Sequence, residues 1–193
     1  ALQEVLAPDE GALLTEGRRA GFEVLLGPTL ERDAGPYGNA LLTRLPVHEV
    51  RRIDLSIPGR EPRGGLDVLL EWHGRALRVV ATHLGLDPDE RRAQSRWLTE
   101  AVRADGKDEG RILLGDLNDW TPWGRTVSAL GALAGPLSRV RTFPSRRPIL
   151  PLDRVAVRVD GVQARHEVLR EPGWRAASDH LPLRAVLEPA AGG

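Results

Sequence analysis

An acid and an amide stand two residues apart directly after an apolar run. Asp116 and Asn118 follow residues 111–115, and Gly115 lets another backbone or a ligand approach closely. Residues two apart on an extended chain point the same way, so we expect a carboxylate beside a carboxamide. The carboxylate can take a proton from water or hold a hard cation, and the amide can orient water or a phosphate oxygen. The alternative is an Asx turn that caps the next helix.

Further acids and histidines stand at the ends of other apolar runs. His83 ends the run that begins at residue 77, Asp153 opens a later run, and Asp179 and His180 precede the last one. Adjacent acid and imidazole groups do not make a serine-type relay, which must line up across space, so we discount a serine hydrolase. Asp153 can instead fix the tautomer of a histidine ring, unless it is a surface ion-pair partner. Because an α/β sheet presents its ligands at the carboxyl ends of strands, we expect these groups to form one site.

The elements that must position these groups are short apolar runs with one strongly marked helix between them. The runs, of four to eight residues, predict strands at 23–27, 39–44, 66–72, 77–84, 111–115, 155–159 and 183–187, and residues 1–5 read as the end of a buried strand. Asp87 and Pro88 predict a helix start, with Glu90 completing a capping box. Its apolar stripe runs from Ala93 to Val102, which places Glu90 and Arg91 on the other side. Two further helices are expected near 9–19 and 121–130. Hairpins mixed with strand–helix–strand units predict an α/β fold with helices outside a mixed sheet or two stacked sheets.

Composition narrows the class of protein. The 193 residues, 41% of them hydrophobic, suit one domain, which we place at 1–188 with a tail at 189–193. The absence of Cys excludes disulfides and thiolate chemistry, and leaves oxygen and imidazole as metal ligands. Zero net charge argues against a polybasic nucleic-acid binder, and no apolar run approaches a membrane span. We expect a cytoplasmic protein.

Positive charge and aromatic rings gather between Trp120 and Leu152. That segment holds five arginines, among them Arg146 and Arg147, and no acidic residue. It predicts a positive surface that attracts a phosphorylated substrate. The alternative is a solvated face whose arginines pair with acids elsewhere in the chain. Trp120 and Trp123 can stack on a base or grip an acyl or sugar group, although we favour their covering a sheet edge.

Six short motifs, in this order, resemble the endonuclease/exonuclease/phosphatase superfamily, which has the deoxyribonuclease I-like fold. They are Leu-Gln-Glu at 2–4, Tyr-Gly-Asn-Ala-Leu-Leu-Thr-Arg at 37–44, Thr-His-Leu at 82–84, Gly-Asp-Leu-Asn at 115–118, Leu-Asp-Arg-Val at 152–155 and Ser-Asp-His-Leu-Pro-Leu at 178–183. The match covers essentially the whole chain. Glu90-Arg91-Arg92 with Gln94, and Thr-Phe-Pro-Ser at 142–145, resemble bacterial members of uncharacterised substrate. The resemblance implies a four-layer sandwich of two packed mixed sheets flanked by helices, with the site at one end.

The resemblance also implies a role for each motif residue. Asp116 resembles the acid that activates the attacking water, Asn118 its neighbour that orients water and phosphate, and His180 the histidine on the scissile phosphate. Asp153 matches the acid that orients that ring, and His83 a second phosphate contact or general acid.

A second group of residues is implied to hold the metal and the substrate. Glu4 and Asp179 resemble the ligands of Mg²⁺ or Mn²⁺. We expect Asn39, Arg146, Arg147 and Trp120 to contact substrate.

The chain departs from the family pattern at its beginning. The family's first strand, which ends in an asparagine, and the helix after it do not precede Leu-Gln-Glu here. We expect that the domain is N-terminally incomplete in this chain, as a fragment of a longer protein, rather than that another segment fills the gap. We expect a metal-dependent phosphoester hydrolase acting on a phosphorylated small-molecule or lipid-derived substrate. The alternatives are a DNA endo- or exonuclease and a binding module that lost catalysis with the missing asparagine.

Overall fold

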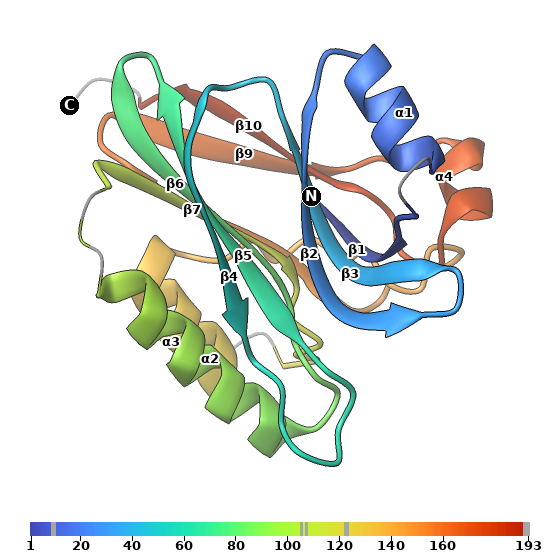
Figure 1. The fold of residues 1–193 in the computed structure, drawn as a ribbon. Coiled ribbons are helices and arrows are strands. Elements are labelled where there is room, and N and C mark those ends of the chain that lie inside the picture. Colours follow the sequence, from blue (N-terminus) through green and yellow to red (C-terminus); the bar gives the residue numbers. More distant parts are fainter. Residues whose placement is uncertain (9–10, 105, 107, 122–123, 191–193) are drawn as a thin grey trace.

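The computed structural model describes residues 1–8, 11–104, 106, 108–121 and 124–190. Figure 1 shows strands in two layers with helices outside them. The strands are β1 (Leu2–Leu6), β2 (Glu23–Arg32), β3 (Gly35–Thr43), β4 (Val47–Asp54), β5 (Gly64–Trp72), β6 (Arg75–His83), β7 (Gly110–Asp116), β8 (Asp153–Val159), β9 (Val162–Val168) and β10 (Leu183–Pro189). The helices are α1 (Ala12–Arg19), α2 (Pro88–Arg103), α3 (Arg125–Ala134) and α4 (Pro172–Ala177).

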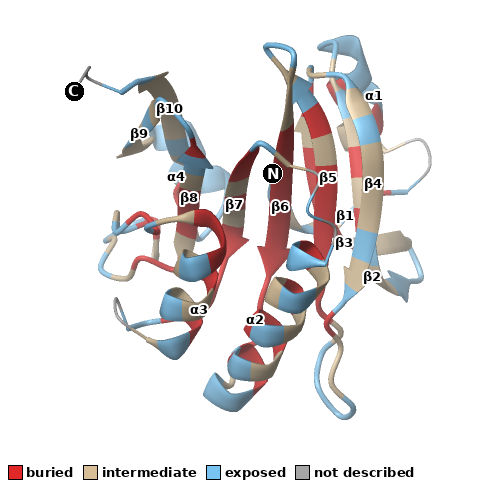
Figure 2. Ribbon diagram, turned by 90° about the vertical axis from the view of Figure 1, so that its left-hand side faces the viewer, coloured by how far each residue is buried: buried red, intermediate tan, exposed pale blue. Residues whose placement is uncertain are grey.

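One layer is a continuous five-stranded sheet in the order β4-β5-β6-β7-β8. Only β6 and β7 run parallel, because α2 connects them by a crossover, and the other neighbours are antiparallel. Helices α2 and α3 lie on one face, where Val80 and Leu113 of the sheet are buried with Leu98 and Leu130 of the helices. In Figure 2 the buried positions concentrate in the central strands of this sheet.

The second layer packs on the opposite face of that sheet. Strands β2 and β3 contact β5, and Leu25 and Leu41 share a core with Leu66 and Val79. This layer consists of a three-stranded sheet, β1-β3-β2, and a two-stranded sheet, β10-β9. The predicted α/β fold, with packed β layers and helices outside, is confirmed.

The two sheets of the second layer are separated by a gap. No strand of the described residues lies between β1 and β10, so each presents an unpaired edge. The gap holds a cavity of about 570 Å³, with Leu2 and Leu183 on its sides and Ile112 and Val155 among the apolar residues below. Strand β1 is therefore half-exposed, with Leu2 and Leu6 each 43% exposed, and the expectation of a buried strand is wrong.

Several element boundaries differ from the prediction. Strand β9 was not expected, because polar residues alternate along it and leave no apolar run. Helix α4 was not expected, because its six residues are too few to show a periodic pattern. Helix α3 begins at Arg125 rather than near Thr121, and Pro122 lies outside the described residues. Strand β10 continues to Pro189, which pairs with Val162, so the tail begins later than expected.

The start of α2 is the predicted one, but its polar side is not exposed. Asp87 Oδ1 accepts from the backbone N–H groups of Asp89 and Glu90, with Pro88 in the first turn. Glu90 and Arg91 are buried, 7% and 8% exposed, because they face the loop after β6 rather than solvent. The periodicity of α2 therefore identifies the side that packs on the core, but not the contact of Glu90 and Arg91 with the loop after β6.

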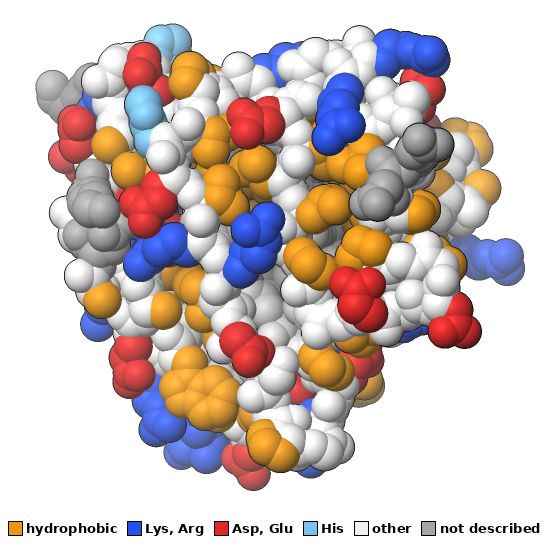
Figure 3. All heavy atoms as spheres, in the orientation of Figure 1, with side chains coloured by type: hydrophobic (Ala, Val, Ile, Leu, Met, Phe, Trp, Pro, Cys, Tyr) orange, Lys and Arg blue, Asp and Glu red, His pale blue; other side chains and the backbone are white. Residues whose placement is uncertain are grey.

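The surface agrees with a chain of no net charge. On the face drawn in Figure 3, side chains of both signs are interspersed with apolar ones. Among the described residues, no helix is long and apolar enough to cross a membrane.

Candidate active site

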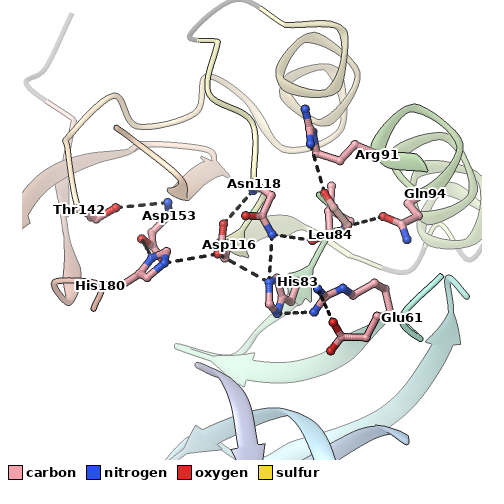
Figure 4. A network of polar contacts seen from close by, with 12 residues as sticks. Glu61, His83, Leu84, Arg91, Gln94, Asp116, Asn118, Thr142, Asp153 and His180 are labelled. Atoms are coloured by element: carbon pink, nitrogen blue, oxygen red, sulfur yellow. Dashed lines mark hydrogen bonds and ion pairs between the residues drawn. The ribbon is translucent and has the colours of Figure 1, made fainter. Parts of the chain in front are cut away.

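Three neighbouring strands bring the predicted residues together. His83 at the end of β6 is the register partner of Asp116 at the end of β7, and Asp116 is the partner of Asp153 at the start of β8. Because β6 and β7 are parallel and β8 is antiparallel, all three positions fall on one edge of the sheet. His180, from the loop before β10, reaches the same edge, as Figure 4 shows.

The turn after β7 fixes Asn118 against its neighbours. Its backbone is left-handed, with φ of 50°, and its N–H donates to Asp116 Oδ1 at 2.8 Å. The expected extended chain is therefore wrong here: an Asx turn bends it, and that turn does not cap a helix because α3 begins only at Arg125. The amide Nδ2 of Asn118 donates to the Leu84 carbonyl at 2.8 Å, which joins the loops after β6 and β7.

Gly115 permits the close approach of β6 and β7, as predicted. It has φ of 143°, and a Cβ there would lie 1.8 Å from the Thr82 carbonyl oxygen. A side chain at this position would push the two strands apart and separate Asp116 from His83.

Asp116 is a buried carboxylate between two imidazole rings. Its Oδ2 lies 3.7 Å from His83 Nε2 and 3.9 Å from His180 Nε2. Burial, and next the charge of Asp153, raise the pKa of Asp116 to about 6, against the N–H of Asn118 and the charge of His180. A carboxylate with a pKa near neutrality is suited to exchange protons with water.

His180 is held by Asp153. Nδ1 lies 2.8 Å from Asp153 Oδ2, and the Phe143 ring is centred 4.8 Å from the imidazole. Burial opposes protonation of His180, but the hydrogen bond and charge of Asp153, with the charges of Asp116 and Asp179, outweigh it and raise the pKa. The ring therefore favours the imidazolium form, directed at Asp116 through Nε2.

His83 has the opposite character. Burial, and next the charges of Arg63 and His180, lower the pKa of His83 to about 3, so the ring is neutral. Arg63 Nη1 lies 3.1 Å from Nδ1, and because a guanidinium only donates, Nδ1 accepts and the ring proton lies on Nε2, 3.7 Å from Asp116 Oδ2. The amide Nδ2 of Asn118, 3.1 Å from Nε2, is itself a donor and does not accept that proton. A neutral ring can donate one hydrogen bond, and the role of His83 as a phosphate contact or general acid stays a prediction.

Arg63 is a site residue that the sequence analysis missed. It is 6% exposed and touches His83, yet it stands between Pro62 and Gly64, where no motif or apolar run marks it. Only the tertiary fold, which pairs the start of β5 with the end of β6, brings it to the site.

Polar residues of α2 brace the loop that follows His83. Arg91 Nη1 donates to the carbonyls of Gly85 and Leu86, and Gln94 Oε1 accepts from the Gly85 N–H at 2.8 Å. A Cβ on Gly85 would lie 2.0 Å from the carboxyl carbon of Glu90. This contact explains the burial of Glu90 and Arg91 noted above.

The two expected metal ligands do not share a cavity. Glu4 is exposed on β1 and lines a cavity of about 10 Å³ with Asn39 and His83. Tyr37 lines the same cavity, and its burial, followed by the charge of Glu4, raises its pKa. Asp179 lines a different hollow. Among the described residues, no three His, Asp or Glu side chains form a group that could hold a metal ion. The assignment of Glu4 and Asp179 as metal ligands therefore stays a prediction from the resemblance.

The expected substrate-binding residues divide into three places. Arg146 and Arg147 line a hollow of about 460 Å³ with Asp179 and Arg175 of α4. Asn39 is buried, and its Nδ2 donates to the Gly64 carbonyl at 2.9 Å. Trp120 is 66% exposed, so it does not cover a sheet edge, and Trp123 lies outside the described residues.

Comparison with known proteins shows the family and agrees with this fold. The family model of the endonuclease/exonuclease/phosphatase family matches residues 1–180. An uncharacterized protein, YbhP of Escherichia coli K12, is 35% identical over 164 residues, which are 79% of this chain and 63% of that protein. The chain thus spans less than two thirds of the length of the curated relatives it matches.

Solved structures share the architecture at low sequence identity. The human Nocturnin catalytic domain has a TM-score of 0.79 at 19% identity, covering 98% of this chain and 79% of that one. A mannosyl-6-phosphatase of Bacteroides thetaiotaomicron has a TM-score of 0.74 at 17% identity, covering 91% and 80%. An endonuclease/exonuclease/phosphatase from Bacteroides vulgatus has 0.75 at 16%, covering 97% and 83%.

The fold is the deoxyribonuclease I-like one of the endonuclease/exonuclease/phosphatase superfamily. Members of this class include phosphatases, phosphodiesterases and nucleases, all hydrolases of phosphoester bonds. The chain belongs to the endonuclease/exonuclease/phosphatase family.

Proposed function

We propose that the protein hydrolyses phosphoesters by attack of a water activated by Asp116. One observation carries the proposal: a buried carboxylate, with a pKa of about 6, lies within 3.9 Å of two imidazole Nε2 atoms at a sheet edge. The carboxylate takes the proton of the water, whose oxygen then attacks phosphorus in line with the departing ester oxygen.

The neighbours of Asp116 are suited to the charge of such a transition state. His180, protonated and held by Asp153, stabilises the phosphoryl oxygens, and His83 donates a hydrogen bond from Nε2. Asn118, fixed to the Leu84 carbonyl, orients water or phosphate without adding charge.

A divalent cation belongs to the proposal as an expectation from the family. Mg²⁺ or Mn²⁺ would neutralise charge on the phosphoryl oxygens. Because Glu4 and Asp179 line separate cavities, we derive no step through a metal, and we assign neither residue as a ligand.

The substrate we propose is a phosphorylated small molecule or a lipid-derived phosphoester. A nuclease activity is the second candidate, favoured by the hollow that Arg146, Arg147 and Arg175 line beside Asp179. Nucleic-acid binding there would weaken steeply with salt.

One screen separates these candidates. The protein is incubated with p-nitrophenyl phosphate, bis-p-nitrophenyl phosphate or plasmid DNA, each with Mg²⁺, Mn²⁺ or chelator. We expect hydrolysis of at least one small ester, and loss of about 10²- to 10⁴-fold in Asp116→Asn with an unchanged circular dichroism spectrum. Equal activity in that variant, or none in the wild type with any metal, overturns the proposal.

A further inference from the structure

A cavity of about 440 Å³ lies beside the candidate active site. Leu86 and Arg91, after β6, line one side, and Trp120 and Arg125, after β7, line the other. The hydrogen bond from Asn118 to the Leu84 carbonyl ties these two loops together, so the cavity adjoins the edge that carries Asp116.

Two apolar side chains stand out at this cavity. Leu86 is 72% exposed and Trp120 is 66% exposed, more than any other large apolar side chain among the described residues. Exposed apolar groups gathered at one hollow mark a binding surface, whereas single ones need no explanation.

Both side chains are held in their exposed positions. The Leu86 carbonyl accepts from buried Arg91 at 2.5 Å. Trp120 follows two buried residues, Asn118 and Asp119. Asp119 Oδ1 accepts from the N–H and the hydroxyl of Thr121 at 3.0 and 2.7 Å, which fixes the turn at Trp120. The side chains of Leu86 and Trp120 are therefore exposed on turns whose backbone is fixed by hydrogen bonds.

The charge at the cavity is positive. The charged lining residues are Arg91, Arg92, Arg125 and Asp119, and Arg92 pairs with Asp89 at 3.2 Å. Arg91 and Arg125 therefore stand against the single carboxylate of Asp119. Arg91 is 8% exposed, and its Nε has no hydrogen-bond partner among the described residues. An occupant must therefore offer both an apolar surface and negative charge.

We propose that this cavity binds an aromatic ring attached to an anionic group, stacked between Trp120 and Leu86. A planar ring matches the indole face and the guanidinium planes together, which a flexible alkyl chain does not. The inference rests on the proposed function in one respect, that the phosphate of the same molecule reaches Asp116. Aryl phosphates and nucleotides both have this chemistry.

Binding without turnover tests the subsite separately from catalysis. In chelator-treated protein, calorimetry measures 1-naphthyl phosphate, adenosine 5′-monophosphate and hexyl phosphate. We expect at least one aromatic ligand to bind about 5-fold or more tighter than hexyl phosphate, and Trp120→Ala to weaken that ligand about 5- to 100-fold with a small effect on hexyl phosphate. Which aromatic ligand binds more tightly distinguishes an aryl group from a nucleotide.

Matched variants serve as controls. Trp174→Ala removes another exposed indole, and Arg158→Gln another exposed arginine; we expect both to change affinity less than 2-fold, whereas Arg125→Gln weakens all three ligands. The subsite is refuted if Trp120→Ala leaves the affinity for the aromatic ligands unchanged, or lowers the affinity for hexyl phosphate by the same factor. It is also refuted if neither aromatic ligand binds at a concentration of 10 mM, about 100-fold above the dissociation constant of a complex of modest affinity. Binding that depends on Trp120 in a protein that hydrolyses no ester refutes the proposed function but not the subsite.

Discussion

Two clusters of buried charge share strand β6 but lie on its opposite faces. Arg78, five residues before His83 and therefore on the other face, faces the helices and pairs with Asp67 of β5 at 2.7 Å. Arg51 also pairs with Asp67, and Asp108 accepts from Arg111 at 2.6 Å.

The clusters differ in how their carboxylates are paired. Each acid beside Arg78 meets at least one permanently charged guanidinium at hydrogen-bond distance, whereas Asp116 has the Asn118 N–H and two imidazoles beyond 3.5 Å. Full pairing is what a buried charge requires for stability, and incomplete pairing raises a pKa and leaves a group free to react. The same strand thus carries a structural cluster and a reactive one.

The largest effect we expect is on turnover in Asp116→Asn. Amide oxygen cannot take a proton from water, so kcat falls about 10²- to 10⁴-fold. The variant should unfold no more readily than the wild type at pH 8, because it removes an incompletely paired buried charge. Steady-state hydrolysis measures kcat, and thermal denaturation measures the stability. A large loss of stability would mean that Asp116 has a structural role.

Asp67→Asn should show the converse behaviour. Removing this carboxylate leaves buried Arg78 and half-buried Arg51 without their shared partner, which costs about 3–5 kcal/mol in the free energy of unfolding. Urea denaturation checks this. Below the unfolding temperature, kcat should change less than 3-fold, since the cluster lies on the face away from His83. A stability like that of the wild type would remove the distinction between the clusters.

The sequence shows the reactive cluster more readily than the structural one. Asp116 and Asp153 stand where apolar runs end and begin, and strand register makes them partners. His180 comes from the loop before β10, in another sheet, and meets them through its contact with Asp153. Arg78 lies inside an apolar run, and its partner depends on which strands pair.

Other features of the site follow from tertiary contacts that no local pattern encodes. The position of Arg63, the burial of Glu90 and Arg91, and the exposure of Trp120 are set by loops packed between elements. For the same reason the metal ligands implied by resemblance, Glu4 and Asp179, stood together in the prediction but line separate cavities.

The pH dependence of stability sharpens the contrast. The folded-state pKa of Asp116, about 6, lies above its unfolded value of 3.8, so its contribution to stability is present below about pH 4 and is lost as pH rises through about 6. In chelator, the free energy of unfolding of the wild type relative to Asp116→Asn should therefore fall by about 2 kcal/mol between pH 4 and 7. Urea denaturation of both proteins across that range measures it. A flat difference, or one of opposite sign, would show that the carboxylate is well paired after all.

The smallest effect concerns the residue that joins His180 to the reactive cluster. Asp153→Asn keeps the side chain's size but removes the charge that holds the His180 ring and favours its protonated form. We expect kcat to fall about 10- to 100-fold, as for other groups that orient a reacting side chain, with KM and the free energy of unfolding close to their wild-type values. Asp160→Asn, in the exposed turn after β8, is the matched control and should leave kcat and the free energy of unfolding unchanged. If Asp153→Asn instead destabilised the protein as Asp67→Asn does, with unaltered kcat, the pair would belong with the structural ion pairs of the sheet, and Asp116 would be left with one functional imidazole, that of His83.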